Sequence, residues 1–318
     1  MVNGATGVAT RVSMFKETTY GTAPAAEDYW KMPFMTTDLG SQQALVASGA
    51  LGMQRDPTDP LQDAPDLTGN MVVPVDARYI GLWLAMLLGA PTSTDHDTYN
   101  QHIFKSGAAT LPSYAIELGY LTPGQYKMET GLMANSMALD FTRKGDAQAT
   151  FALIGQKEAT AGASGAGTPA ALTISRFAQI NNLVKLNGTA LTNVLTAKLN
   201  FTNNLSTNET IGNSGNIGGI DAAEPALTGT LSARFTDETL IADAIAGTPV
   251  ALTFGFSLSN ILSLTILCPR VFLKKPNAPV TGPGGIQVDF DFTGSFDSAT
   301  GAMMTATLLN DLDGTQYA

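Results

Sequence analysis

Two histidines in a polar stretch of the chain are the first residues whose types suggest chemistry. His96 and His102 lie six positions apart in the sequence DHDTYNQH, with Asp95 and Asp97 beside the first of them. Imidazole nitrogens and carboxylate oxygens are zinc ligands, so this spacing would permit a metal site. The surrounding segment, residues 92–110, is polar and has the composition of a loop. We therefore expect a solvated loop there and no bound metal.

The other candidates for chemistry are isolated. A hydrolase triad would need one of the two histidines, and no Gly-x-Ser-x-Gly turn accompanies them. Glu117 alternates with apolar residues in a predicted strand, so we expect it on a solvated face and not in catalysis. Residues 311–314, DLDG, begin like a calcium loop, but no distal glutamate follows. Cys268 lies in the apolar run ILSLTILC, which predicts a buried thiol. We expect no catalytic residue, no cofactor and no metal.

The elements that carry these residues follow a pattern that occurs twice. Residues 67–91, LTGNMVVPVDARYIGLWLAMLLGAP, correspond to residues 227–249, LTGTLSARFTDETLIADAIAGTP, at an offset of 160. Each copy consists of a strand with alternating apolar residues, a short amphipathic helix and a Gly-x-Pro exit. An offset near half the chain indicates two tandem copies of one domain.

We therefore expect a mainly β protein of two tandem β-sandwich or β-barrel domains, each with one flanking α-helix. The predicted organisation is an N-terminal arm over residues 1–28, a first copy over 29–158, a small-residue linker over 159–171 and a second copy over 172–318. A chain of 318 residues is long enough for two hydrophobic cores. The residues that we expect in the domain cores are Trp83, Leu84, Leu87, Ile241, Ile245, Phe254 and Phe290.

Both copies carry a long polar segment at the same topological position. Residues 36–66 follow the first strand of one copy, and residues 202–226 follow that of the other. Segments of this length are uncommon in compact domains unless they have a function, and the simplest shared role is contact with another subunit. The residues that we expect at this contact are Arg55, Asp56, Asp59, Asp63, Asn208, Glu209, Asn213, Asn216 and Asp221.

The composition restricts the function further. The formal charge is −10, from 27 acidic and 17 basic side chains, so the chain is unsuited to wrapping nucleic acid phosphates tightly. It could instead line a conduit that DNA crosses without adhering. The N-terminal residues lack the basic start and apolar core of a signal peptide, and the longest apolar helical run, residues 80–90, is too short to cross a bilayer. We expect a soluble protein made in a reducing cytoplasm, with no membrane partner.

The first copy resembles a known family. KETTYGTAPA at residues 16–25, the long polar segment, PDLTGN at residues 65–70 and DARYIGLWLAMLLGAP at residues 76–91 resemble the major tail tube proteins of long-tailed bacteriophages. The resemblance implies tail-tube-type β-sandwich domains in subunits that form rings with a continuous inner β-barrel. It also implies that the long polar segments and the terminal arm contact neighbouring subunits and that the rings stack.

The resemblance further implies a symmetry and a set of partners. If a ring holds six tube domains, a chain with two of them needs three copies, so we expect a trimeric, pseudo-sixfold ring with a formal charge of three times −10, or −30. Such rings would stack head to tail into the tail tube, the channel for DNA ejection. Tail terminator and distal tail proteins would bind the tube, and a tape measure protein and then DNA would occupy the lumen without sequence-specific binding. Assembly would occur in the host bacterial cytoplasm, and the product would be part of the virion.

Two other classes remain open. A secreted tandem β-sandwich adhesin or carbohydrate-binding module would show secretion and aromatic platforms, whereas this chain has two tryptophans, Trp30 and Trp83. A jelly-roll enzyme would need clustered histidine or carboxylate ligands. The repeat and the paired polar segments favour a structural assembly protein over both.

Overall fold

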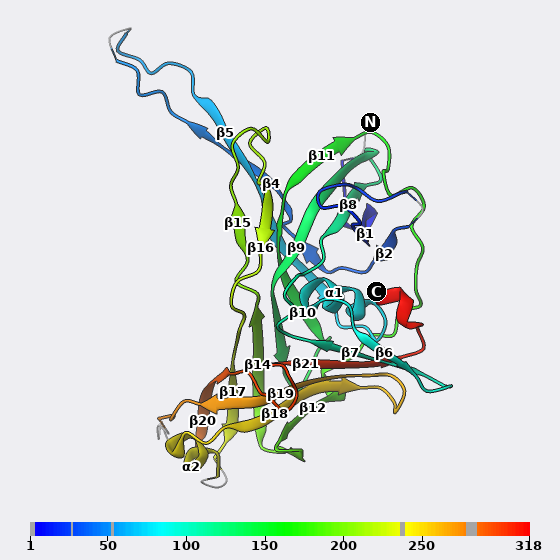
Figure 1. Cartoon of the computed structure of the whole chain (residues 1–318), viewed down its shortest axis with the longest axis vertical. Helices are drawn as coiled ribbons and strands as arrows, with labels where there is room; N and C mark the ends of the chain where they lie inside the picture. The colour runs from blue at the N-terminus through cyan, green and yellow to red at the C-terminus, as the bar shows by residue number, and fades with distance from the viewer. Residues whose placement is uncertain (1–3, 27, 52–53, 236–238, 278–284) are drawn as a thin grey trace.

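The computed structural model describes residues 4–26, 28–51, 54–235, 239–277 and 285–318. The chain is mainly β, as predicted, and its strands pair in antiparallel fashion (Figure 1). The elements up to residue 161 are η1 (Gly7–Ala9), β1 (Thr10–Lys16), β2 (Trp30–Met32), β3 (Thr36–Thr37), β4 (Gly40–Val46), β5 (Leu61–Pro74), α1 (Tyr79–Leu88), β6 (Thr92–Asp95), β7 (Asn100–Lys105), β8 (Tyr114–Tyr120), β9 (Gln125–Phe141), β10 (Gln148–Gly155) and β11 (Lys157–Ala161). Those that follow are η2 (Gln179–Asn181), β12 (Asn182–Leu186), β13 (Thr189–Ala190), β14 (Val194–Thr202), β15 (Ser206–Asn208), β16 (Gly219–Asp221), β17 (Ala226–Arg234), α2 (Thr239–Ala246), β18 (Val250–Ser257), β19 (Ser263–Leu273), β20 (Gln287–Gly294), β21 (Thr305–Asn310) and η3 (Gly314–Tyr317).

The two halves of the chain pair their strands in the same order. In the first half β1 pairs with β8, and the sheet continues through β9 and β10 to β5. In the second half β12 pairs with β18, and the sheet continues through β19 and β20 to β17. Phe151 lies opposite Met71 in one half, and Phe290 lies opposite Leu231 in the other. Helix α1 follows β5 in the first half, and helix α2 follows β17 in the second.

Two strand contacts join the halves. β9 pairs with β14, with Phe141 opposite Ala197, and β21 returns from the end of the chain to pair with β7. Apolar side chains follow the same junction, since Phe141 stacks on Phe254 and Phe256 with ring centroids 5.3 and 5.1 Å apart. One large hydrophobic cluster therefore extends through both halves, where we expected two separate cores.

Helix α1 is buried on all sides. Its ten residues are inaccessible to solvent because β7 and η3 cover the face that the sheet leaves open. Asp76 accepts hydrogen bonds from the backbone N–H groups of Arg78 and Tyr79, at 2.9 and 3.2 Å, and so caps the helix start as predicted. Gly89 ends the helix with a φ of 93°, a conformation that favours glycine. No helix among the described residues is long and apolar enough to span a membrane.

Helix α2 is covered less completely. It packs on β19, and no counterpart of the β6–β7 hairpin covers it in the described part of the chain. Ile241 is half-buried, and the side chain of Ile245 is 61% exposed, so the expectation that Ile245 belongs to the core is wrong. The other expected core residues, Trp83, Leu84, Leu87, Phe254 and Phe290, are buried.

Several segments expected to be irregular contain strands. Residues 10–16 of the expected arm form β1, which pairs with β8 along its whole length. Much of residues 36–66 belongs to a long hairpin of β4 and β5. Alternation of apolar and polar residues is absent in the outer part of that hairpin because both of its faces are exposed to solvent.

Candidate assembly interface

The structure separates the two histidines. His96 is exposed and stacks on Tyr99, with ring centroids 4.8 Å apart. His102 lies in β7 and is fully buried, with Nδ1 2.8 Å from Oγ of Ser93 and Nε2 3.0 Å from Oδ1 of Asn310. The expectation of a solvated loop is therefore wrong for β7, because that strand pairs with β21. Within the described ranges, no group of three or more His, Cys, Asp or Glu side chains is placed to hold a metal ion.

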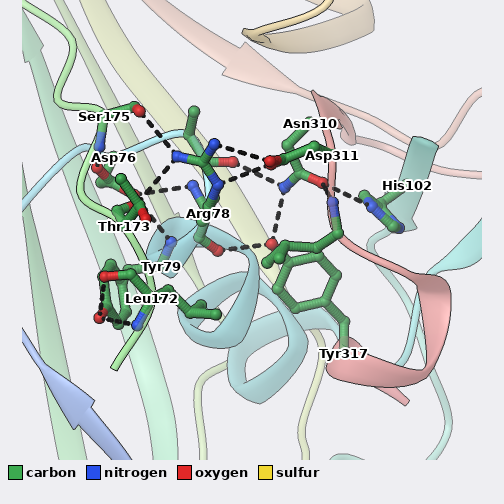
Figure 2. A network of polar contacts seen from close by, with 12 residues as sticks. Asp76, Arg78, Tyr79, His102, Leu172, Thr173, Ser175, Asn310, Asp311 and Tyr317 are labelled. Carbon is green, nitrogen blue, oxygen red and sulfur yellow. Dashed lines mark hydrogen bonds and ion pairs between the residues drawn. The ribbon is translucent and has the colours of Figure 1, made fainter. Parts of the chain in front are cut away.

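His102 belongs to a polar network that ties the end of the chain to the start of α1 (Figure 2). Asn310 donates from Nδ2 to the carbonyl of Ala77 at 2.7 Å and to the hydroxyl of Tyr317 at 2.8 Å. The Tyr317 hydroxyl donates in turn to the carbonyl of Arg78 at 2.6 Å. Because the Asn310 nitrogen is used, its oxygen faces Nε2 of His102, which must carry the proton. Burial lowers the pKa of His102, which favours the neutral ring with Nδ1 accepting from the Ser93 hydroxyl.

The guanidinium of Arg78 extends the network to residues 173–175, which follow the expected linker. It contacts the two carboxylate oxygens of Asp311 at 2.7 and 2.9 Å, the carbonyl of Thr173 at 2.9 Å and the hydroxyl of Ser175 at 2.8 Å. Hydrogen bonding to Arg78 lowers the pKa of Asp311 below its ordinary value. Asp311, in the DLDG sequence, thus serves as an ion-pair partner. We call Arg78, Asn310, Asp311 and Tyr317 the C-terminal clamp.

Acidification should weaken the C-terminal clamp through His102. Burial lowers the pKa of His102 below its ordinary 6.5, so below that pH the unfolded chain binds a proton that the folded chain resists. The free energy of unfolding should therefore fall as the pH drops from 6.5, by at most about tenfold in the unfolding constant per pH unit. His102→Gln should flatten this dependence in urea unfolding between pH 7 and 5. The exposed His96→Gln is the control, and an equal flattening by both substitutions would contradict the assignment.

Glu117 does not lie on a solvated face, contrary to expectation. Its side chain is fully buried, with Oε1 2.8 Å from the guanidinium of Arg11. Oε2 accepts the backbone N–H groups of Gly165 and Ala166 at 2.6 and 3.0 Å. The expected linker is therefore packed against β8, and the carboxylate has the partners that a buried charge requires. Cys268 is buried as predicted, and burial raises the pKa of its thiol to about 12.

The two long polar segments converge at one end of the molecule. The β4–β5 hairpin and the β15–β16 hairpin project toward the upper end in Figure 1. They are in contact, since a methyl group on Gly215 would lie 3.0 Å from Cδ of Pro65. A groove of about 460 Å³ between them is lined by Asp63, Asp66 and Glu209, among others. This end of the molecule is therefore acidic.

The residues that we expected at a subunit contact lie on these two hairpins. Asn216 is half-buried, and its Nδ2 donates to the carbonyl of Asn213 at 3.1 Å, which shapes the turn. The exposed members of the set are Arg55, Asp56, Asp59, Asp63, Asn208, Glu209, Asn213 and Asp221. Sequence reasoning missed the apolar side chains among them, of which Leu51, Leu61 and Ile211 are 95%, 74% and 106% exposed. Isolated apolar residues in a polar segment are the signal that would have identified them.

The β15–β16 hairpin of the second half is anchored on the first half. Asn203 donates from Nδ2 to the carbonyls of Leu87 and Ala134, at 2.8 and 3.0 Å. It thereby satisfies a carbonyl at the end of α1 that lacks a partner within the helix. Gln156 donates to the carbonyl of Ile217 at 3.1 Å, closer to the tip. The β15–β16 hairpin is thus held by the end of α1, by β9 and by the residue that follows β10.

A continuous antiparallel ladder runs through both halves in the order β4, β5, β10, β9, β14, β17 and β20. At one end, β4 has no second strand partner within the described ranges. At the other end, residues 287–290 of β20 pair with β17 and with no other described strand. The ladder therefore has an open edge along β4 and a second, shorter one along residues 287–290 of β20, because residues 292–294 pair with β19. Open edges are surfaces for pairing with other strands.

One face of the ladder is apolar and packs in the core, and the other is exposed. A row of small side chains crosses the exposed face, formed by Thr150, Ala138, Asn200, Thr228 and Thr293. The charged residues that the register places on this face between β9 and β20 are Asp140, Lys198, Arg234, Asp289 and Asp291. Nζ of Lys198 lies 3.7 Å from the carboxylate of Asp140. The face is thus mostly small and polar among these strands, and its two basic residues, Lys198 and Arg234, lie on different strands.

These features are those of a mainly β subunit with open sheet edges and projecting hairpins. Residues 7–294 match the family model described as phage tail tube protein. The chain belongs to the phage tail tube family, which confirms the resemblance seen in its sequence, and membership implies a structural component of the virion that assembles with copies of itself. Comparison with curated proteins gave no match.

Proposed function

We propose that three copies of the chain form a ring with pseudo-sixfold symmetry and that such rings stack head to tail into the tube of a phage tail, the channel for DNA ejection. Each chain would contribute two tube domains produced by duplication. The shared order of strand pairing in the two halves supports this, since β1, β8, β9, β10 and β5 correspond one by one to β12, β18, β19, β20 and β17.

The junction between the halves is an antiparallel strand pairing, and a strand pairing of this kind would also join neighbouring chains. Within one chain, β9 of the first half pairs with β14 of the second. The β4 edge and the open part of β20 lie at opposite ends of the ladder, so pairing them between neighbouring copies would continue the ladder around a ring. Closure removes edges that would otherwise drive uncontrolled association. The ladder with two open edges is the observation that carries the proposal.

The exposed face of the ladder would line the channel. Its side chains are mostly small and polar, and Lys198 is opposed by Asp140 at 3.7 Å. Tight binding to DNA phosphates needs clustered lysine and arginine, so DNA would pass this face without adhering. A tape measure protein would fill the channel before DNA does, and tail terminator and distal tail proteins would bind the tube. Assembly would take place in the host cytoplasm.

Negative-stain electron microscopy of the concentrated protein, with rotational averaging of end-on views, tests this proposal. We expect tubes with a central channel and threefold symmetry in the averages. Native mass spectrometry of single rings should give three chains of 33.2 kDa. Six chains in a ring would refute the trimeric arrangement. Protein that remains monomeric at high concentration would contradict spontaneous assembly and favour a tube that grows only from an initiator complex.

A further inference from the structure

We propose that the apolar tips of the two long hairpins of one chain insert into two adjoining clefts at the opposite end of a second copy in the next ring. This inference rests on the proposed function, in which rings stack, and it adds the surface that receives the hairpins. It identifies the partner as a second copy of this chain.

The receiving surface consists of two clefts around the β12–β13 hairpin. The first, which we call the α2 cleft, has a volume of about 440 Å³ and includes Phe235 and Arg234 in its lining. The second, the β12 cleft, has a volume of about 400 Å³ and includes Leu195 and Arg143. Leu191 lines both. Phe235 and Leu195 are 39% and 46% exposed, so apolar surface is open to solvent at this end as well.

The hairpins offer apolar groups of matching kind. Leu61 lies opposite Val46 in the β4–β5 hairpin, and the two are 74% and 47% exposed. Leu51, beyond the end of β4, is 95% exposed, and Ile211, between β15 and β16, is 106% exposed. Apolar side chains gathered at the tips of polar hairpins mark a surface that becomes covered on association.

The charges of the hairpins and of the cleft linings are complementary. Residues 40–66 contain four aspartates and one arginine, and residues 203–226 contain two glutamates, one aspartate and no basic residue. The charged residues that line the two clefts are Arg143 and Arg234, and both are exposed. Opposite charges at the rim of an apolar contact favour one orientation and exclude a contact between two acidic ends.

The positions of the two surfaces also fit a stack. The hairpins lie toward the upper end of the long axis in Figure 1, and α2 and β12 lie at the lower end. When a contact joins two different surfaces at opposite ends of the subunit, each added ring leaves one of these surfaces free at either end of the stack. It therefore produces an open stack of rings and not a closed pair. Each chain carries two hairpins and two clefts, which allows each hairpin its own cleft.

Disulfide cross-linking within assembled tubes tests this contact. Cys268 is the sole cysteine of the sequence and is buried, so any disulfide between chains must come from the introduced cysteines. Ile211→Cys combined with Leu191→Cys should give a ladder of covalent multimers on non-reducing gels, because Leu191 lines both clefts. Ile211→Cys combined with Val8→Cys is the matched control, since Val8 is 101% exposed and lies outside both clefts.

A charge-reversal series provides a second readout. Arg143→Glu with Arg234→Glu should leave rings intact but reduce the mass of tubes recovered by sedimentation at least about tenfold. Adding Asp59→Lys and Glu209→Lys to the same chain should restore tubes. Tubes of the Ile211→Cys, Leu191→Cys variant that form no disulfide between chains, or a charge-reversed variant that forms tubes like the wild type, would overturn the inference and leave the proposed function standing. Failure of the wild type to form rings or tubes would overturn both.

Discussion

Replacing Tyr317 with alanine is expected to lower the free energy of unfolding by about 3–5 kcal/mol. The ring is 2% exposed and packs edge-on against His102, with centroids 4.8 Å apart. Its hydroxyl also joins Asn310 to the carbonyl of Arg78. Tyr317→Phe keeps the ring and removes the hydroxyl, so it should cost about 1–3 kcal/mol. Urea denaturation of the two variants and the wild type separates the packing contribution from the polar one.

Gly81 provides a sharper test of the same contact. A methyl group on Gly81 would overlap the ring of Tyr317, so Gly81→Ala should destabilise the wild type by about 1–3 kcal/mol. In the Tyr317→Ala background no ring occupies the space beside Gly81, and alanine stabilises a helix by about 1 kcal/mol relative to glycine. The same substitution should then be neutral or stabilising. A double-mutant cycle measures this reversal, and additive effects would contradict the packing that we describe.

Glu129→Gln should stabilise the protein at alkaline pH. The side chain of Glu129 is fully buried, and neither carboxylate oxygen has a hydrogen-bond partner in the structure. Glu129 lies directly opposite Glu158, whose carboxylate is 3.1 Å from Nζ of Lys127. Burial first, and then the charge of Glu158, raise the pKa of Glu129 to about 8. At neutral pH the folded chain therefore holds a proton that the unfolded chain releases.

The sign of the effect follows from this difference in proton binding. Between the ordinary pKa near 4.5 and about 8, the wild type should lose stability as the pH rises, by up to about 1.4 kcal/mol per pH unit. Glu129→Gln should remove this slope, with a gain of roughly 3–5 kcal/mol at pH 8.5 and little change at pH 5. Urea unfolding across this range measures it, with the exposed Glu209→Gln as control. Equal slopes for Glu129→Gln and the wild type would show that the carboxyl ionises without cost.

The parts of the fold that depend on local pattern could be predicted from the sequence. The apolar stripe of α1, its cap at Asp76 and its end at Gly89 all lie within a few residues of one another, so the helix was found. The matching strands of the two halves were found because the repeat preserves their alternation. The family resemblance rested on the same local segments and was confirmed by the match over residues 7–294.

Features that depend on distant partners could not be predicted. His102 is polar in a polar segment, and its burial requires Asn310, which lies far along the chain. Glu117 is buried because Arg11 and the expected linker pack against it. The residues of its own strand give no indication of either partner. At the candidate interface, the polar composition of the hairpins predicted that their residues are exposed. The clefts could not be predicted, because they form where β12, β14, β17 and α2 meet in the fold.

The pairing of β21 with β7 has a consequence for the order of synthesis. β7 ends at residue 105, and the strand that completes its edge begins at residue 305, near the end of the chain. While the ribosome makes the intervening residues, the outer side of α1 stays uncovered, because η3 and Tyr317 have not yet been made. A chain released too early would leave α1 and the edge of β7 uncovered. The first half therefore cannot complete its fold before residues 305–317 have been made, and a chain that lacks them would not present the finished surface that a growing polymer incorporates.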